Sequence, residues 1–176
     1  MPSRAKAKGN AWERDVAKHL SEVFNENFMR VPNSGAYTGG ANVFRVDNLT
    51  ETQKRMMDGD IIVPESISNW KIECKNYKDL DFHGFFTKSR QLDEWIKQAE
   101  SGLKWFLVVK ITRKCKFVCF AEQYRRTFHY LNYTYYKSYI LADYNNFFEN
   151  NFWKMRELNE KDIQHICITE KSVQTG

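Results

Sequence analysis

Two short segments, residues 58–63 and 70–76, constrain the fold of this chain most strongly. The first contains a β-branched run that ends at Pro64, and the second is a strand-like stretch beyond a polar turn. Runs of this kind, bounded by turn residues, are typical of β-strands. We therefore expect two neighbouring strands that form a hairpin-like pair.

Charged side chains interrupt both of these segments. Asp60 directly precedes the apolar run, and a carboxylate is costly in such a place unless something binds it. In the second segment Glu73 and Lys75 are two residues apart and share one face of the strand, whereas Ile72 and Cys74 point into the core. Two carboxylates and an ammonium group are therefore expected to converge.

This constellation suits metal-assisted hydrolysis. The carboxylates of Asp60 and Glu73 and the backbone carbonyl of Cys74 are oxygen ligands of the kind that magnesium prefers. A metal ion there can bind a phosphate oxygen and lower the pKa of a bound water molecule, while Lys75 orients that water or stabilises the developing negative charge. Spacing alone leaves an ordinary cross-strand ion network open as the alternative.

The rest of the sequence predicts helices and strands around this pair. Apolar residues recur at helical spacing over 10–27 and over 89–101, with Ser89 as the cap of the second helix and Gly102 as its stop. Strands are predicted at 28–31, 43–46, 105–111 and 116–120, the last two around a basic turn. This order predicts a mixed β-sheet with helices packed against it.

Aromatic side chains crowd the segment from Tyr124 to Trp153. One interpretation is a layer that packs on the sheet or forms a dimer contact, because aromatic residues dominate cores and interfaces. The other is a surface that stacks against unpaired bases, since basic residues such as Arg125 and Arg126 lie nearby in the sequence.

Composition excludes several classes of protein. The chain has 176 residues, enough for one domain with its own core, and a net charge of +5. It has no apolar run of the length that a membrane span needs and no secretory signal, so we expect no membrane partner and a cytoplasmic location. The four cysteines have no C-x-x-C spacing, which argues against disulfides and structural zinc. Local clusters of basic residues make a polyanionic partner worth testing, although any one cluster could be a solvated face.

Five ordered motifs carry a resemblance to a known family. They are KGNAWERD at 8–15, RVPNSGA at 30–36, GDIIV at 59–63, IECKN at 72–76, and Gln91 at the start of the second helix. The chain resembles the PD-(D/E)XK nucleases, which have the restriction-endonuclease-like fold, and most closely the archaeal-type Holliday junction resolvases. The resemblance runs from Lys8 to about Phe120 and implies a central mixed β-sheet flanked by helices, here followed by an aromatic-rich C-terminal extension.

The resemblance also implies the residues of an active site. Asp60 and Glu73 would be the metal ligands, and Lys75 would be the catalytic lysine. Glu13 would support the metal from the first helix, directly or through water. Because Glu13 lies off the apolar stripe of that helix, a solvated helix residue remains the alternative.

Further residues are assigned in the same way. Ser34 would lie near the scissile phosphate, and Gln91 would belong to the catalytic set, unless Gln91 is only a polar helix start. The residues expected to contact the nucleic acid are Lys8, Arg14, Arg30 and Ser34 from the resemblance, and Arg113, Lys114 and Lys116 from the basic turn.

Two departures from the family pattern affect these assignments. Gly59 stands where the family has proline, and Asp58 offers a second carboxylate on the same strand face, so Asp58 could replace Asp60 as the ligand. We favour Asp60 because it directly precedes the apolar run. The insert at 41–58, with a helical stretch that Thr50 can cap, is longer than expected and leaves the substrate geometry open.

Together these observations predict one domain, with a nuclease core at 1–121 and an extension at 122–176 that packs on it. The richness in Asn, Lys, Tyr, Ile and Phe suits an AT-rich genome such as that of a phage. The expected function is a magnesium-dependent endonuclease, for which manganese can substitute, that resolves four-way DNA junctions as a homodimer. The alternatives are a nuclease of the same fold that cuts linear, flap or single-stranded DNA, and a catalytically decayed DNA-binding protein.

Overall fold

The structure is a computed structural model that describes residues 4–32, 58–81, 83–100 and 104–173. Four predictions fall outside these residues: the strand at 43–46, the helical stretch capped by Thr50, the position of Ser34 and the stop at Gly102.

Within the described part of the chain, five strands form one mixed sheet. Their order is β3 (Trp70–Tyr77), β4 (Lys104–Ile111), β5 (Cys115–Ala121), β7 (Tyr139–Asp143) and β6 (Thr134–Tyr136). β3 and β4 are parallel, whereas the other neighbours are antiparallel. The predicted mixed sheet is confirmed, and it is consistent with the restriction-endonuclease-like fold.

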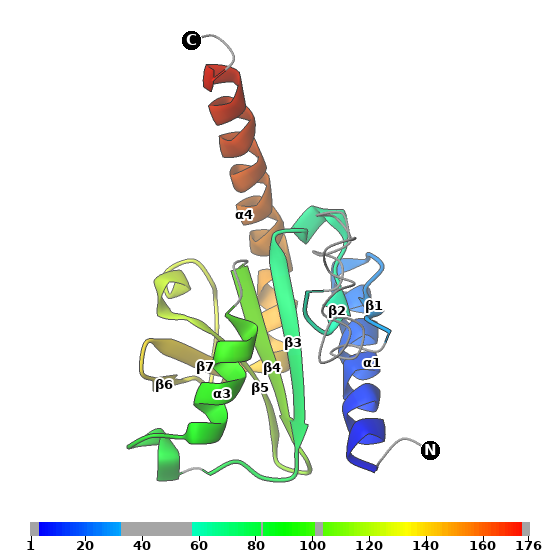
Figure 1. Cartoon of the computed structure of the whole chain (residues 1–176), viewed down its shortest axis with the longest axis vertical. Coiled ribbons are helices and arrows are strands. Elements are labelled where there is room, and N and C mark those ends of the chain that lie inside the picture. Colours follow the sequence, from blue (N-terminus) through cyan, green and yellow to red (C-terminus); the bar gives the residue numbers. More distant parts are fainter. Residues whose placement is uncertain (1–3, 33–57, 82, 101–103, 174–176) are drawn as a thin grey trace, which may run out of the picture.

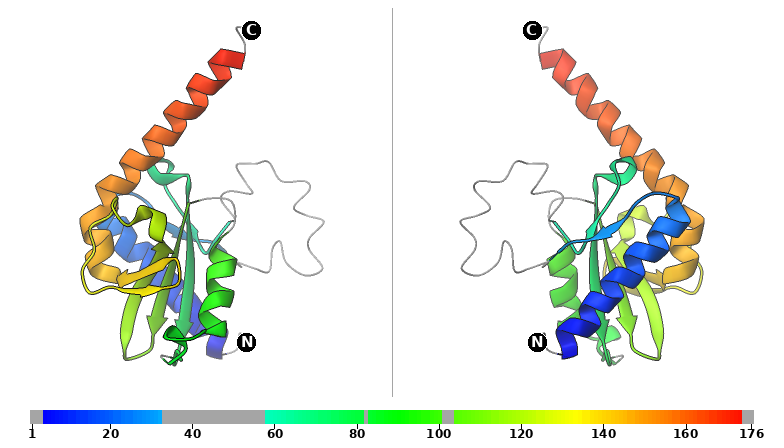
Figure 2. Two further views of the ribbon diagram at one scale, coloured as in Figure 1. Left: turned by 90° about the vertical axis from the view of Figure 1, so that its left-hand side faces the viewer. Right: turned by 90° about the vertical axis from the view of Figure 1, so that its right-hand side faces the viewer.

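Helices cover both faces of this sheet (Figures 1 and 2). α1 (Arg4–Phe24) and the first half of α4 (Tyr144–Val173) lie on one face, and α3 (Arg90–Ala99) lies on the other. The remaining half of α4 extends away from the sheet. α1 begins before the predicted 10–27 and ends sooner, because Asn25 adopts a left-handed backbone with φ 53°. Ser89 caps α3 as predicted, since its hydroxyl accepts the N–H of Leu92 at 3.3 Å.

The predicted hairpin between 58–63 and 70–76 is wrong. β2 (Ile61–Ile62) pairs antiparallel with β1 (Met29–Arg30), whereas β3 pairs with β4. Pro64 has no N–H with which to continue a ladder, and it leads into the short 3-10 helix η2 (Glu65–Ile67). Two further short 3-10 helices, η3 (His83–Phe85) and η4 (Glu122–Tyr124), occur in the connections.

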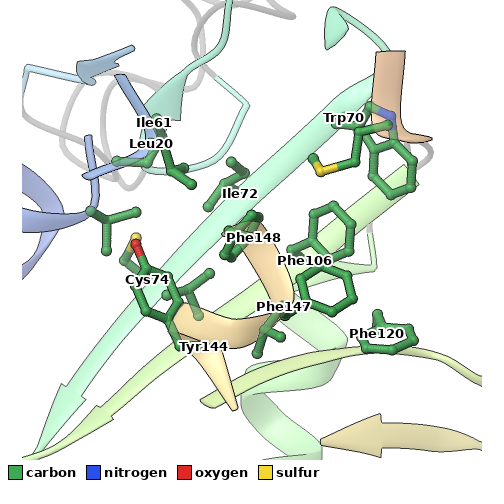
Figure 3. Close-up of a cluster of buried hydrophobic side chains, with 14 of the residues drawn as sticks. Leu20, Ile61, Trp70, Ile72, Cys74, Phe106, Phe120, Tyr144, Phe147 and Phe148 are labelled. Carbon is green, nitrogen blue, oxygen red and sulfur yellow. The ribbon is translucent and has the colours of Figure 1, made fainter. Parts of the chain in front are cut away.

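The main core lies between the sheet and the pair α1 and α4. Ile72 and Cys74 point into it from β3, as predicted, and the rings of Phe106, Phe147 and Phe148 pack beside them (Figure 3). The C-terminal third therefore contributes β6, β7 and α4 to the same sheet and core. These buried aromatic residues fit the interpretation of a layer that packs on the sheet.

None of the helices in the described ranges is long and apolar enough to cross a membrane.

Candidate active site

Asp60 lies against the outer edge of β3, one of the two edge strands of the described sheet. Its N–H donates to the carbonyl of Ile72 at 2.9 Å, and its own carbonyl accepts the N–H of Val31 at 2.9 Å. Its carboxylate oxygen Oδ2 accepts the N–H of Cys74 at 2.8 Å. Hydrogen bonds to backbone on two sides thus fix Asp60, and they explain how a carboxylate with only 9% exposure is tolerated.

Gly59 explains why this chain lacks a proline before Asp60. Its backbone has φ 95°, which proline, fixed near about −65°, cannot adopt. A Cβ atom at Gly59 would lie 2.9 Å from the carbonyl oxygen of Ile72 and 3.0 Å from Cγ of Lys71. Only glycine permits this close approach of the Asp60 segment to β3.

Glu73 and Lys75 form an ion pair on the face of β3 opposite to Ile72 and Cys74. Nζ of Lys75 lies 2.8 Å from Oε1 of Glu73. Burial raises the pKa of Glu73, the nearby Asp60 carboxylate raises it further, and Lys75 opposes both effects. Because the Asp60 carboxylate accepts the N–H of Cys74, the residue that follows Glu73, the two carboxylates lie near each other. Their convergence on one metal ion stays a prediction.

Asp58 has a different environment from Asp60. Its Oδ1 atom lies 2.9 Å from Nζ of Lys71, a lysine that is buried on the face of β3 that also carries Glu73. Asp58 is therefore held by a cation, whereas the Asp60 carboxylate accepts a backbone N–H beside Glu73. This difference favours Asp60 as the ligand, and the assignment stays a prediction.

Glu13 is buried in α1 and is held by an arginine. Nε of Arg30 donates to Oε2 of Glu13 at 2.5 Å, and Nη2 of Arg30 donates to Oδ1 of Asn10 at 3.1 Å. Burial raises the pKa of Glu13, the Arg30 bond opposes this effect, and Asp60 adds to it. Glu13 thus belongs to the same electrostatic cluster as Asp60, and Arg30, predicted to contact DNA, lies inside this cluster.

The oxygen atoms of this cluster fit a hard cation with few protein ligands. Among the described residues, no group of three or more His, Cys, Asp and Glu side chains is arranged to hold a metal ion. Magnesium, however, is commonly bound through one or two carboxylates plus water. Asp60 and Glu73 are such a pair, and the Cys74 carbonyl leaves β3 on the same side as the Cys74 N–H that Asp60 accepts.

Three other expected residues lie on the helices that flank the sheet. Gln91 is half-buried in the first turn of α3, and Arg14 is exposed on α1. The carbonyl of Lys8 accepts Nδ2 of Asn76 at 3.1 Å, so Asn76 joins the start of α1 to β3 next to Lys75. Asn76 belongs to the IECKN motif, but no role for it could be read from the sequence.

The basic turn between β4 and β5 is exposed and partly paired. Lys114 binds Asp79 at 2.6 Å, and Lys116 lies over the ring of Trp12 at 5.6 Å. Arg113 is exposed and has φ 61°, which places it at the tip of the turn. A shallow hollow of about 310 Å³ is lined by these three basic residues and by Lys110.

Lys71 is a further residue of this region that was not predicted from the sequence. The alternation of β3 provides the signal, because residue 71 shares the face of residues 73 and 75. A lysine at this position does not reveal by itself that it is buried and bound to Asp58.

The chain matches the model of a known protein family over most of its length. The model of the family described as "Phage putative PDDEXK endonuclease" matches residues 4–167, which include α1, every described strand and most of α4. Comparisons with curated proteins and with solved structures found no match.

Proposed function

Because the chain belongs to the phage putative PDDEXK endonuclease family, we propose that it is a magnesium-dependent endonuclease that cleaves branched DNA. The expected substrate is the four-way junction, which a homodimer would resolve by paired nicks in the host cytoplasm. A dimer with twofold symmetry presents identical sites to a junction of matching pseudo-symmetry.

The position of Asp60 carries this proposal. Its backbone is held by Val31 and Ile72, and its carboxylate lies at the outer edge of β3 beside the ion pair of Glu73 and Lys75. Ion pairs here join Arg30 to Glu13, Lys71 to Asp58 and Lys75 to Glu73, whereas the Asp60 carboxylate accepts the backbone N–H of Cys74 beside Glu73. Carboxylates held together in this way favour a bound cation.

When bound by Asp60, Glu73 and the Cys74 carbonyl, magnesium would supply a Lewis acid for the phosphate and a water molecule of lowered pKa. Lys75 would donate to the attacking water or to the negative charge that develops on the phosphate. Glu73 holds the Lys75 ammonium at 2.8 Å and so orients it. Glu13, fixed by Arg30, would accept a hydrogen bond from the hydrated site.

The basic residues would bind the backbone of the substrate. Lys8 and Arg14 on α1, and Arg113, Lys114 and Lys116 on the turn, lie on elements that pack next to β3 or β4. Contacts of this kind recognise the shape and charge of DNA more than its sequence.

A second substrate class is supported by the exposed tyrosines near β6. Tyr133 and Tyr135 contact each other edge to face at 5.7 Å, and Arg125 lies 5.6 Å from the ring of Tyr135. Exposed aromatic rings beside a guanidinium group suit stacking against unpaired bases. Flaps or single strands are therefore the alternative substrates.

The test is cleavage of four-way junctions, flaps, linear duplexes and single strands of matched length, with magnesium and with a chelator. We expect magnesium-dependent paired nicks in the junction, and loss of cleavage in Asp60→Asn and Glu73→Ala. Asn keeps an oxygen that can accept the Cys74 N–H, so Asp60→Asn tests the charge rather than the fold.

The matched control is Asp79→Asn, which removes an exposed carboxylate that pairs with Lys114 and accepts the N–H of Leu80. Undiminished cleavage by both site variants would contradict the site assignment. Junction binding without cleavage in any divalent ion would favour a decayed nuclease.

A further inference from the structure

Lys71 is a buried cation that the proposed chemistry does not use. It lies on β3 two residues before Glu73, and its side chain is only 5% exposed. Its Nζ atom lies 2.9 Å from Oδ1 of Asp58 and 3.0 Å from the carbonyl oxygen of Gln98. A buried ammonium group is costly unless hydrogen-bond partners replace its water. The contacts with Asp58 and Gln98 therefore hold the Lys71 ammonium in place.

The two partners of Lys71 come from different elements. Gln98 lies in the last turn of α3, where backbone carbonyls lack helical partners and attract cations. Asp58 precedes β2 by three residues and lies in the segment that delivers Asp60. Lys71 therefore joins β3, the end of α3 and the Asp58–Asp60 segment at one point.

The Asp58–Asp60 segment is pressed closely onto β3. Gly59 lies so near that an added Cβ atom would meet both the Ile72 carbonyl and the Lys71 side chain. Asp60 is held on one side of Gly59 by its hydrogen bonds to Val31, Ile72 and Cys74, and Asp58 is held on the other side by Lys71. The ion pair thus anchors the end of the segment that these hydrogen bonds do not reach.

We propose that the ion pair of Lys71 and Asp58 is a clamp that fixes the Asp60 carboxylate at the outer edge of β3. Asp58 and Lys71 are then positioning residues, and neither touches the metal ion or the phosphate. The inference rests on the proposed function for its catalytic consequences. The proposal also gives the two lysines of β3 different roles. Lys75 pairs with Glu73 at the site, whereas Lys71 pairs with Asp58 and positions its segment.

The catalytic test is a double-mutant cycle of Lys71→Met, Asp58→Ala and the double variant. We expect each single variant to lower single-turnover cleavage about tenfold and to raise the magnesium concentration needed for half-maximal cleavage. The double variant loses little more than either single variant, because both changes break one interaction. DNA affinity without magnesium stays unchanged. The control is Glu94→Gln, which breaks the exposed pair of Glu94 and Arg90 at 3.0 Å.

A second measurement is independent of activity. Hydrogen exchange at the N–H groups of Asp60 and Cys74 reports whether the Asp60 segment stays on β3. In Lys71→Met, which fills the buried position with an apolar side chain and takes the Lys71 ammonium away from the partly exposed Asp58 carboxylate, we expect these two amides to exchange about tenfold faster. The amides of Val108 and Val118, in the centre of the sheet, should keep their wild-type rates.

Several results would overturn the clamp. Wild-type exchange at Asp60 and Cys74 in both single variants would do so whether or not the chain cleaves DNA. The clamp would also be overturned if the fold-loss of cleavage rate in the double variant equalled the product of the two single fold-losses. An Asp58→Ala variant that is as inactive as Asp60→Asn and keeps wild-type exchange would overturn it as well. If the wild-type chain cleaves no DNA, the proposed function fails and hydrogen exchange alone decides the clamp.

Discussion

Two lysine–carboxylate pairs, one at the edge of β3 and one beside the basic turn, have similar distances and opposite surroundings. Lys75 and Glu73 are 2.8 Å apart with side chains 17% and 14% exposed, whereas Lys114 and Asp79 are 2.6 Å apart with side chains 59% and 70% exposed. Exposed pairs contribute little because water screens them, whereas buried pairs are costly to break. Single substitutions at the edge of β3 should therefore change cleavage strongly. At the basic turn DNA binding should be the sum of several weak contacts, so single substitutions there should have small effects.

The largest effect expected from this contrast is that of Lys75→Met. Removing the ammonium leaves Glu73 without its cation and the transition state without a donor, so we expect single-turnover cleavage to fall about 10² to 10³-fold. Junction affinity measured without divalent ions should change less than about threefold, because one phosphate contact at most is lost. Equal losses of affinity and of rate would contradict a catalytic role.

The next effect is on stability, through the buried pair of Arg30 and Glu13. Arg30→Met leaves a buried carboxylate without a partner, so we expect a loss of about 3 kcal/mol in the free energy of unfolding. For a domain of this size that loss corresponds to a fall of roughly 6 to 12 °C in Tm. The variant Arg30→Lys keeps a positive charge and should lose less. Thermal unfolding of both variants provides the measurement, and equal Tm values would show that the charge at residue 30 is unimportant.

A smaller effect links pH, magnesium and stability. Burial raises the pKa of Glu73 and of Glu13, so the folded protein holds protons there more tightly than the unfolded chain. Without metal, stability should therefore fall as the pH rises from about 4.5 through the raised pKa values. Magnesium binds the ionised groups, so the gain in Tm on adding magnesium should be larger at pH 7 than at pH 5. An equal gain at both pH values would contradict binding at these carboxylates.

The smallest effect is expected at the basic turn. Lys114→Met removes an exposed charge, so junction affinity should fall by about twofold at moderate salt and the salt dependence should become shallower by roughly 0.9. Cleavage at saturating DNA should stay at the wild-type rate. A loss of rate as large as that of Lys75→Met would remove the contrast between the two regions.

The sequence predicts the sheet and the site to different extents. Alternation in β3 predicts which side chains enter the core, and Ile72 and Cys74 do so. The pairing partner of β2 could not be read in this way, because register depends on contacts between distant segments, here with β1. The same limit applies to Arg30, whose bond to Glu13 joins β1 to α1.

The structure explains why Gly59 replaces the proline of the family motif. The sequence shows only that the proline is missing. In the structure the backbone of Gly59 has φ 95° and lies close to Ile72, and proline could adopt neither arrangement. The partners of Asp58 and Lys71 likewise become visible only when β3 and the segment before β2 are placed together.

The most direct test of the central claim is the position of a divalent ion in crystals of the protein grown with manganese and located by anomalous scattering. We predict an ion whose ligands include the Asp60 and Glu73 carboxylates at about 2.2 Å, with the Cys74 carbonyl nearby and Lys71 still bound to Asp58. An ion coordinated by Asp58 in place of Asp60 would contradict this account, and so would the absence of any ion at the edge of β3.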